Sequence, residues 1–175
     1  NGTRSVFVDR AGDLWVGNFP RGVNYHNSAS AVFTNYSHEF GRDYSLSHSA
    51  VLSFLQDQDG EYWVGTEEGL NRFNMREGTF QHYLKDTANP HALQADAILS
   101  LVEDAHGEIW GGTWSGGAFR FNKRTGRFRH YKTTDEPGSI GSNYIWHLML
   151  DKHKRLWLST ETNGINLYAA ATDTF

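Results

Sequence analysis

The chain has 175 residues, no cysteine and a formal net charge of −4, and it is 38% hydrophobic and 14% aromatic. The missing cysteines exclude disulfides and thiolate metal sites, and a chain of this length is expected to form one domain. No run of lysine or arginine occurs, and no apolar run approaches the roughly 20 residues of a membrane helix. We therefore expect no nucleic-acid partner and no direct membrane contact.

The chain opens with Asn1, and neither an initiating methionine nor a signal-like apolar stretch is present near its start. We therefore expect a piece of a longer protein.

Strand-type stretches follow one another along the chain, rich in Val, Ile, Phe, Tyr and Trp and bounded by Gly, Asp and Asn. A helical period is absent. The second copy of the pattern is the clearest: an apolar stretch, an Asp-x-x-Gly turn, a Trp-containing strand, a strand after a glycine, and a Phe-x-x-Tyr strand. Its landmarks are Asp57, Gly60, Trp63, Gly69, Phe80 and Tyr83.

This unit occurs four times, and its anchor is a tryptophan that recurs after 48, 47 and 47 residues, at positions 15, 63, 110 and 157. Four strands in about 47 residues is the size of one β-propeller blade. We therefore predict an all-β fold of four propeller blades, each with four antiparallel strands labelled A to D from the axis outwards. The indole of each blade is expected to pack between neighbouring sheets.

The predicted domain is a single propeller over residues 1–175, with blades at about 1–44, 45–91, 92–138 and 139–175. The last copy stops at Phe175, where its strand D should begin. Three arrangements stay open: part of a larger propeller, a four-bladed ring, or two chains that join into eight blades. We favour part of a larger propeller.

Residues Asp57 to Phe73 follow the pattern Asp-x-x-Gly-x-Leu-Trp-Val-Gly-Thr-x-x-Gly-Leu-x-x-Phe almost position for position. The pattern resembles the repeat of the two-component regulator propeller family. The resemblance implies a sensor in the periplasmic or extracytoplasmic portion of an inner-membrane protein, with a histidine kinase or diguanylate cyclase as output. It also implies a small-molecule or oligosaccharide ligand, no cofactor and no enzymatic activity in this segment.

Two other functions are kept as alternatives. One is a protein-interaction or dimerisation propeller, which contacts a second copy through its blade edges or contacts the remainder of the parent protein. The other is a propeller-type glycosidase or lyase, although no acid pair stands out among the loop carboxylates. Ligand sites in propellers usually lie on the face that carries the B-to-C and D-to-A connections, by analogy with the fold.

Residues that depart from the repeat are the candidates for a site. Trp114 lies in a B-to-C loop where the other copies have Arg21, Glu67 and Glu161 among their residues. An exposed aromatic plane there suits stacking against a sugar ring. The simpler interpretation is that Trp114 packs on the neighbouring loop.

The start of the fourth strand A departs as well. His147 stands where the other copies have serine, Trp146 replaces a leucine, and Tyr144 lies two residues before it. These side chains could line the mouth of a pocket, or the inner strand could simply be packed differently in this copy. Glu67, Glu161 and Arg21 give the same rim charged groups, for which a solvated loop is the alternative.

Phe119 is a third departure, since the other copies have Asn24, Asn71 and Asn166 there. We expect these asparagines to tie strand C to a neighbouring loop by amide hydrogen bonds. The stretch from Asp57 to Gly60 resembles part of a calcium loop without the later ligands, and we interpret it as a turn. No metal site and no catalytic residue is predicted.

Overall fold

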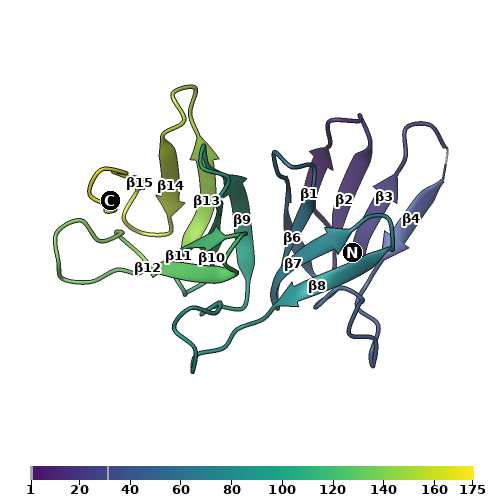
Figure 1. Ribbon diagram of the computed structural model, residues 1–175, viewed down its shortest axis with the longest axis horizontal. Coiled ribbons are helices and arrows are strands. Elements are labelled where there is room, and N and C mark those ends of the chain that lie inside the picture. Colours follow the sequence, from purple (N-terminus) through teal and green to yellow (C-terminus); the bar gives the residue numbers. More distant parts are fainter. Residues whose placement is uncertain (1, 31) are drawn as a thin grey trace. The chain divides into compact units, whose positions relative to one another are not determined.

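The computed structural model describes residues 2–30 and 32–175, and all of its regular structure is β-sheet (Figure 1). The first two antiparallel sheets consist of β1 (Gly2–Val8), β2 (Leu14–Phe19), β3 (Gly22–His26), β4 (Phe33–Tyr36), β5 (Val51–Gln56), β6 (Tyr62–Thr66), β7 (Gly69–Asn74) and β8 (Thr79–Tyr83). The other two consist of β9 (Ile98–Glu103), β10 (Ile109–Thr113), β11 (Ala118–Asn122), β12 (Arg127–Tyr131), β13 (Ile145–Leu150), β14 (Leu156–Thr160) and β15 (Ile165–Leu167).

Within each sheet the strands follow one another in sequence order, so that every strand pairs with the next along the chain. This up-and-down sheet is a propeller blade, and the prediction of all-β blades is confirmed. The fourth sheet has three strands, followed by an isolated bridge between Ala169 and Thr174. The fourth repeat thus has strands A to C, and its strand D is not formed among the described residues.

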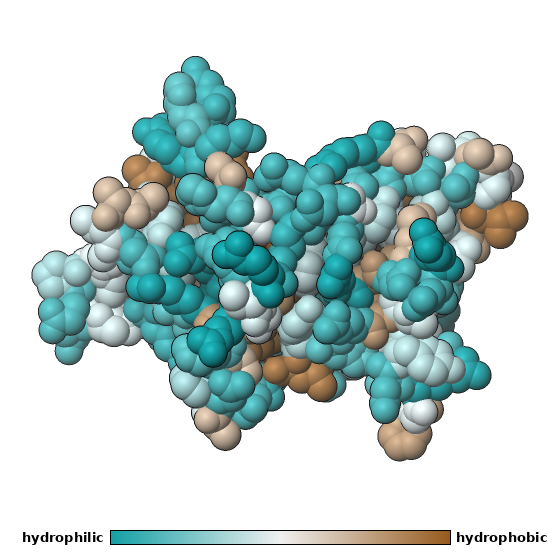
Figure 2. Space-filling model, viewed as in Figure 1, coloured by the Kyte–Doolittle hydropathy of each residue, from teal (hydrophilic) through white to brown (hydrophobic). Residues whose placement is uncertain are grey.

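The blades group into two compact units, Asn1–Leu84 and Lys85–Phe175, each with two blades. Among the described residues no helix is long and apolar enough to cross a membrane. The surface in Figure 2 is mostly hydrophilic, with hydrophobic residues in small separate patches. Single exposed apolar residues of this kind are normal for a folded domain.

The Asp-x-x-Gly turn is built around its carboxylate. In the second blade, Oδ1 of Asp57 accepts hydrogen bonds from the backbone N–H of Asp59 at 3.0 Å and of Glu61 at 2.9 Å. Its Oδ2 accepts the indole N–H of Trp63 at 2.9 Å. Gly60 completes the turn at a φ of 86°, a region that side-chain-bearing residues rarely adopt. The stretch is therefore a turn, as predicted.

The indole contact recurs in every copy. Asp9 holds Trp15 at 2.9 Å, and in the third and fourth blades the corresponding distances are 2.8 and 3.0 Å. Burial favours a higher pKa for Asp9, but hydrogen bonds from Trp15 and Tyr62 outweigh it and hold the pKa below the usual 3.8. The hydrogen bond from Trp157 likewise lowers the pKa of Asp151.

The indole of the first blade in each unit joins that blade to the second. The Trp15 ring lies 4.7 Å from the Tyr62 ring and 5.8 Å from the Phe73 ring, both of the second blade. In the other unit, Trp110 lies 4.7 Å from Tyr168 of the fourth blade. Only 1% of Trp15 and of Trp110 is exposed, so these tryptophans are packing anchors between sheets.

The expected asparagine ties are present. Oδ1 of Asn71 accepts the N–H of Ser47 at 2.9 Å, and its Nδ2 donates to the Ser47 hydroxyl at 2.8 Å. Asn166 accepts the N–H of Gly141 at 3.0 Å. Both asparagines thus fix the inter-blade loop to strand C of the blade that follows it. Asn24 instead bonds to Asn35 of its own blade at 3.1 Å.

Phe119, which stands where the other copies have asparagine, is fully buried. Changes at two other positions, Gly111 and Gln94, compensate for it. It pairs with Gly111, and a Cβ at Gly111 would overlap the Phe119 ring. The other copies have Val or Leu at the position of Gly111. Gln94, at the loop position of Ser47, donates to the carbonyls of Asp86 at 2.7 Å and Asn89 at 2.9 Å. Its loop is therefore closed without help from strand C.

We expect Asp9→Ala to lower the free energy of unfolding by about 3 kcal/mol, because the buried indole of Trp15 and two backbone N–H groups lose a charged acceptor. Urea denaturation followed by tryptophan fluorescence measures this. Asp43→Ala, an exposed aspartate of the same unit, is the control and should change little. Equal stability of the two variants would contradict the role given to Asp9.

Stability should also fall at acidic pH. The pKa of Asp9 is lowered in the folded chain, so the unfolded chain binds the proton first as the pH drops. The contribution is fully present above the unfolded pKa, near 4, and is lost as the pH falls through the lower folded pKa. Asp9→Asn should flatten this loss in denaturation curves recorded between pH 5 and 2. An unchanged slope would contradict the prediction.

Gly111→Val should lower the free energy of unfolding by about 2 kcal/mol, because the added side chain meets the Phe119 ring. Combining it with Phe119→Asn and Gln94→Ser restores the arrangement of the second blade and should recover part of that loss. Thermal and chemical denaturation of the single and triple variants test the coupling. A triple variant less stable than Gly111→Val would show that the three positions are not exchanged as a set.

Candidate functional site

Three loop positions are equivalent on the second, third and fourth blades, and each is tied to the segment that leads into strand A. Trp114 donates its backbone N–H to the carbonyl of Ala97 at 3.1 Å. Glu161 bonds to Tyr144 at 3.0 Å and Glu67 to Ala50 at 3.1 Å in the same way. The backbone of each B-to-C loop therefore lies beside the start of the inner strand of its own blade, and Glu161 is held in this way beside the start of β13.

Three of the predicted site residues meet in the second unit. The Trp114 ring lies 5.1 Å from the Tyr144 ring at an interplanar angle of 79°, and 5.2 Å from the Trp146 ring at 70°. We call these three residues the aromatic rim. Trp114 is 44% exposed and Trp146 is 49% exposed. Trp114 thus packs on its neighbours, as the simpler interpretation had it, and also keeps much of its surface open to solvent.

A β-bulge places Trp146 at the surface. The pairing of β13 with β14 shifts between Ile145 and His147, which leaves Trp146 as the extra residue. The same shift occurs at Arg4, Leu52 and Leu99 in the other blades. A bulge changes the direction in which a side chain points. All four blades share this bulge, but only the fourth has a tryptophan there.

His147 follows the bulge and is exposed. Its Nδ1 lies 3.4 Å from the hydroxyl of Ser100 on the neighbouring blade, and the same hydroxyl accepts the N–H of Leu148 at 3.0 Å. The ring is therefore held at one nitrogen, and Nε2 has no partner among the residues that the structure describes. The imidazole of His147, which can form hydrogen bonds, thus directly follows the bulged Trp146 in β13.

The carboxylate of Glu161 adds charge beside the aromatic rim, since its backbone is bonded to Tyr144 and its side chain is exposed. Glu67 and Arg21 belong to the first unit. Glu67 lies 3.9 Å from His48, and Arg21 lines a separate groove of about 660 Å³ together with Asn24 and other polar side chains. The predicted residues therefore fall on both units, and the aromatic rim is the group whose members touch.

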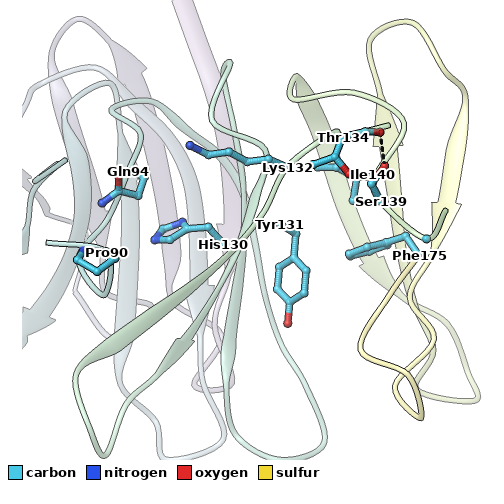
Figure 3. Close-up of a pocket in the computed structure, with 10 residues that line it drawn as sticks. Pro90, Gln94, His130, Tyr131, Lys132, Thr134, Ser139, Ile140 and Phe175 are labelled. Carbon is cyan, nitrogen blue, oxygen red and sulfur yellow. Dashed lines mark hydrogen bonds between the residues drawn. The ribbon is translucent and has the colours of Figure 1, made fainter. Parts of the chain in front are cut away.

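A hollow in the second unit was not predicted from the sequence. It has a volume of about 490 Å³ and lies against the end of β12, with His130, Tyr131 and Lys132 among its lining (Figure 3). The signal that could have found it is Lys132, which stands where the earlier copies have Ser37 and Leu84. A charge at a position that is neutral in its siblings is a departure like that of Trp114.

The fold and the site define the protein as a blade-repeat module with an exposed aromatic rim. Residues 45–68 and 139–162 match the family described as two component regulator propeller. Two segments of the chain, at the start of the second and of the fourth blade, therefore match the repeat of that family. No curated protein matches the chain.

Solved structures with the same fold include two extracellular domains described as those of hybrid two component systems of B. thetaiotaomicron. One has a TM-score of 0.85 and 21% identity over 100% of this chain and 23% of its own. The other has a TM-score of 0.77 and 23% identity over 95% and 21%. A virginiamycin B lyase from Staphylococcus aureus has a TM-score of 0.67 and 18% identity over 98% and 56%. The chain thus spans less than a quarter of the two extracellular domains.

Proposed function

We propose that the chain is a sensory ligand-binding module in the extracytoplasmic part of a bacterial signalling protein of the two-component type, and that its ligand is a carbohydrate. The aromatic rim carries the proposal, because it is a cluster of partly exposed rings in which Trp114 and Trp146 depart from the repeat. The fold of extracellular sensor domains supports the proposed location. The segment binds and does not catalyse.

The geometry of the rim suits a sugar. Trp114 meets Tyr144 and Trp146 at steep angles, so the rings form the walls of an angular surface and do not stack flat against one another. The C–H face of a pyranose can lie on such a ring, and its hydroxyls then need polar partners. Glu161 supplies an acceptor and the exposed His147 a donor or acceptor close by.

Signalling would follow from population shift. A ligand that contacts the B-to-C loop of the third blade and strand A of the fourth favours the arrangement in which both surfaces face it together. The free energy that can shift the equilibrium is the difference between the ligand's binding free energies for the two arrangements of the blades. A ligand whose two affinities differ little can therefore shift only a closely balanced equilibrium.

We expect Trp114→Ala to weaken oligosaccharide binding about tenfold, since a lost stacking contact is worth about 1.4 kcal/mol at most. Isothermal titration of the full chain against a panel of oligosaccharides, preceded by a thermal-shift screen, measures this. Phe40→Ala is the matched control, because Phe40 is an exposed aromatic of the first unit outside the rim. A panel with no binder, or equal affinity in both variants, would count against the proposal.

A second candidate is dimerisation, favoured by the exposed outer face of the first blade. Val6 is 63% and Phe33 is 53% exposed, whereas Phe80, the counterpart of Phe33 in the second blade, is 6% exposed. Phe80 and Phe73 lie in the core cluster that also contains Trp15. A second copy of this chain is the proposed occupant of the first-blade face. The half-buried Trp157 of that copy can pack on this face as Trp15 packs against the second blade.

Light scattering after size-exclusion chromatography tests this candidate. A dimer has twice the mass of the 19.9 kDa chain, and Val6→Glu should return it to the monomer. Leu84→Glu, an exposed apolar position outside β1, is the control. A monomer at all concentrations rules out the candidate. Glycan turnover by the purified chain would instead favour an enzyme, a possibility raised by the lyase with a similar fold.

A further inference from the structure

The hollow beside β12 lies between two successive inter-blade loops of the second unit. Pro90 and Gln94 come from the loop that leads into β9, and residues 134 and 138–140 come from the loop that leads into β13. His130, Tyr131 and Lys132 line it from β12 and its end, and Phe175 closes it from the chain's last residue (Figure 3). None of these residues belongs to the aromatic rim.

Hydrogen bonds hold both walls of the hollow in place. Nε2 of His130 bonds to the carbonyl of Ala92 at 2.8 Å, which ties the strand to the first loop. In the second loop, the Ser139 hydroxyl donates to the carbonyl of Thr134 at 2.9 Å, and Phe175 donates its N–H to Gly138 at 2.8 Å. A ligand would therefore meet a largely formed surface and pay little for ordering loops.

The lining combines an apolar surface with one positive charge. Ile140 is fully buried, Tyr131 is buried, and the Phe175 ring lies 5.5 Å from the Tyr131 ring. Lys132 is the charged residue, exposed and without an ion-pair or hydrogen-bond partner within residues 2–30 and 32–175. In Figure 3 its side chain extends over the hollow towards the loop that carries Gln94.

No side-chain carboxylate lines the hollow, although the second loop carries Asp135 and Glu136 at exposed positions. Burial lowers the pKa of His130 and so favours its neutral form at neutral pH. The ammonium group of Lys132 is thus the feature that selects a ligand by charge. Pockets of this volume with an apolar lining and few polar groups typically hold small organic molecules.

We propose that this hollow binds a small organic carboxylate with an apolar body, whose carboxylate pairs with Lys132 and whose body lies on Phe175 and Tyr131. The site is separate from the aromatic rim and from the carbohydrate proposed to bind there. It gives the module a second ligand of different chemistry.

The probe is 3-phenylpropionate, and its neutral analogue 3-phenylpropionamide is the matched ligand control. NMR titration of the full chain at low ionic strength should give a dissociation constant in the millimolar range or below, with shifts at Tyr131, Ile140 and Phe175. The amide should bind at least about tenfold more weakly, because the ion pair is lost. Equal binding of both compounds, or no shifts at these residues, would overturn the proposal.

Lys132→Gln should weaken binding of the carboxylate about tenfold and leave that of the amide unchanged. Lys152→Gln, which removes an exposed charge from the turn after β13, is the control variant. Trp114→Ala should leave carboxylate binding intact, and Lys132→Gln should leave oligosaccharide binding intact, so the two proposals fail or succeed separately. Unchanged carboxylate affinity in Lys132→Gln would show that the lysine does not form the site.

Discussion

The contact between the turn aspartate and the indole N–H determines how each blade can pack. One carboxylate closes the turn between two strands and also fixes the plane of the tryptophan, as Asp57 does for Trp63. A buried indole without an acceptor would cost free energy, so strand and turn are coupled. Because the plane is fixed, Trp15 can lie against Tyr62 of the next blade, whose hydroxyl in turn donates to Asp9 at 2.8 Å. Turn, strand and blade packing therefore depend on the same carboxylate.

With the sheets fixed in this way, the loops between them are free to differ. The asparagines of strand C hold two of these loops, and Gln94 holds a third from within. Backbone hydrogen bonds then align the B-to-C loop with the start of the inner strand at the same place in three blades. A loop side chain of one blade can then meet the start of the inner strand of the next blade, as Trp114 meets Trp146. The aromatic rim thus occupies positions whose side chains are not needed for the turns or for the packing of the blades.

The sequence was sufficient for the blades because each landmark has a local physical cause: a positive φ at Gly60, a carboxylate at Asp57, a large ring at Trp63. It also singled out the members of the aromatic rim. It could not show that Arg21 and Trp114 belong to different compact units, since that depends on packing between blades. The hollow beside Lys132 was missed because its walls are irregular loops, whose conformation depends on hydrogen bonds far apart in sequence.

Departures from a repeat are of two kinds, and burial and compensation separate them. Phe119 breaks the pattern, but Gly111 provides room for its ring and Gln94 replaces the lost tie to the loop, so the change is absorbed inside the fold. Trp114 and Lys132 break the pattern at exposed positions, and Trp114 stays 44% exposed even though it packs against Trp146. An uncompensated aromatic or charged side chain at a surface gives the fold little stability. Its chemistry is available to a ligand, which makes exposed departures the better guide to binding.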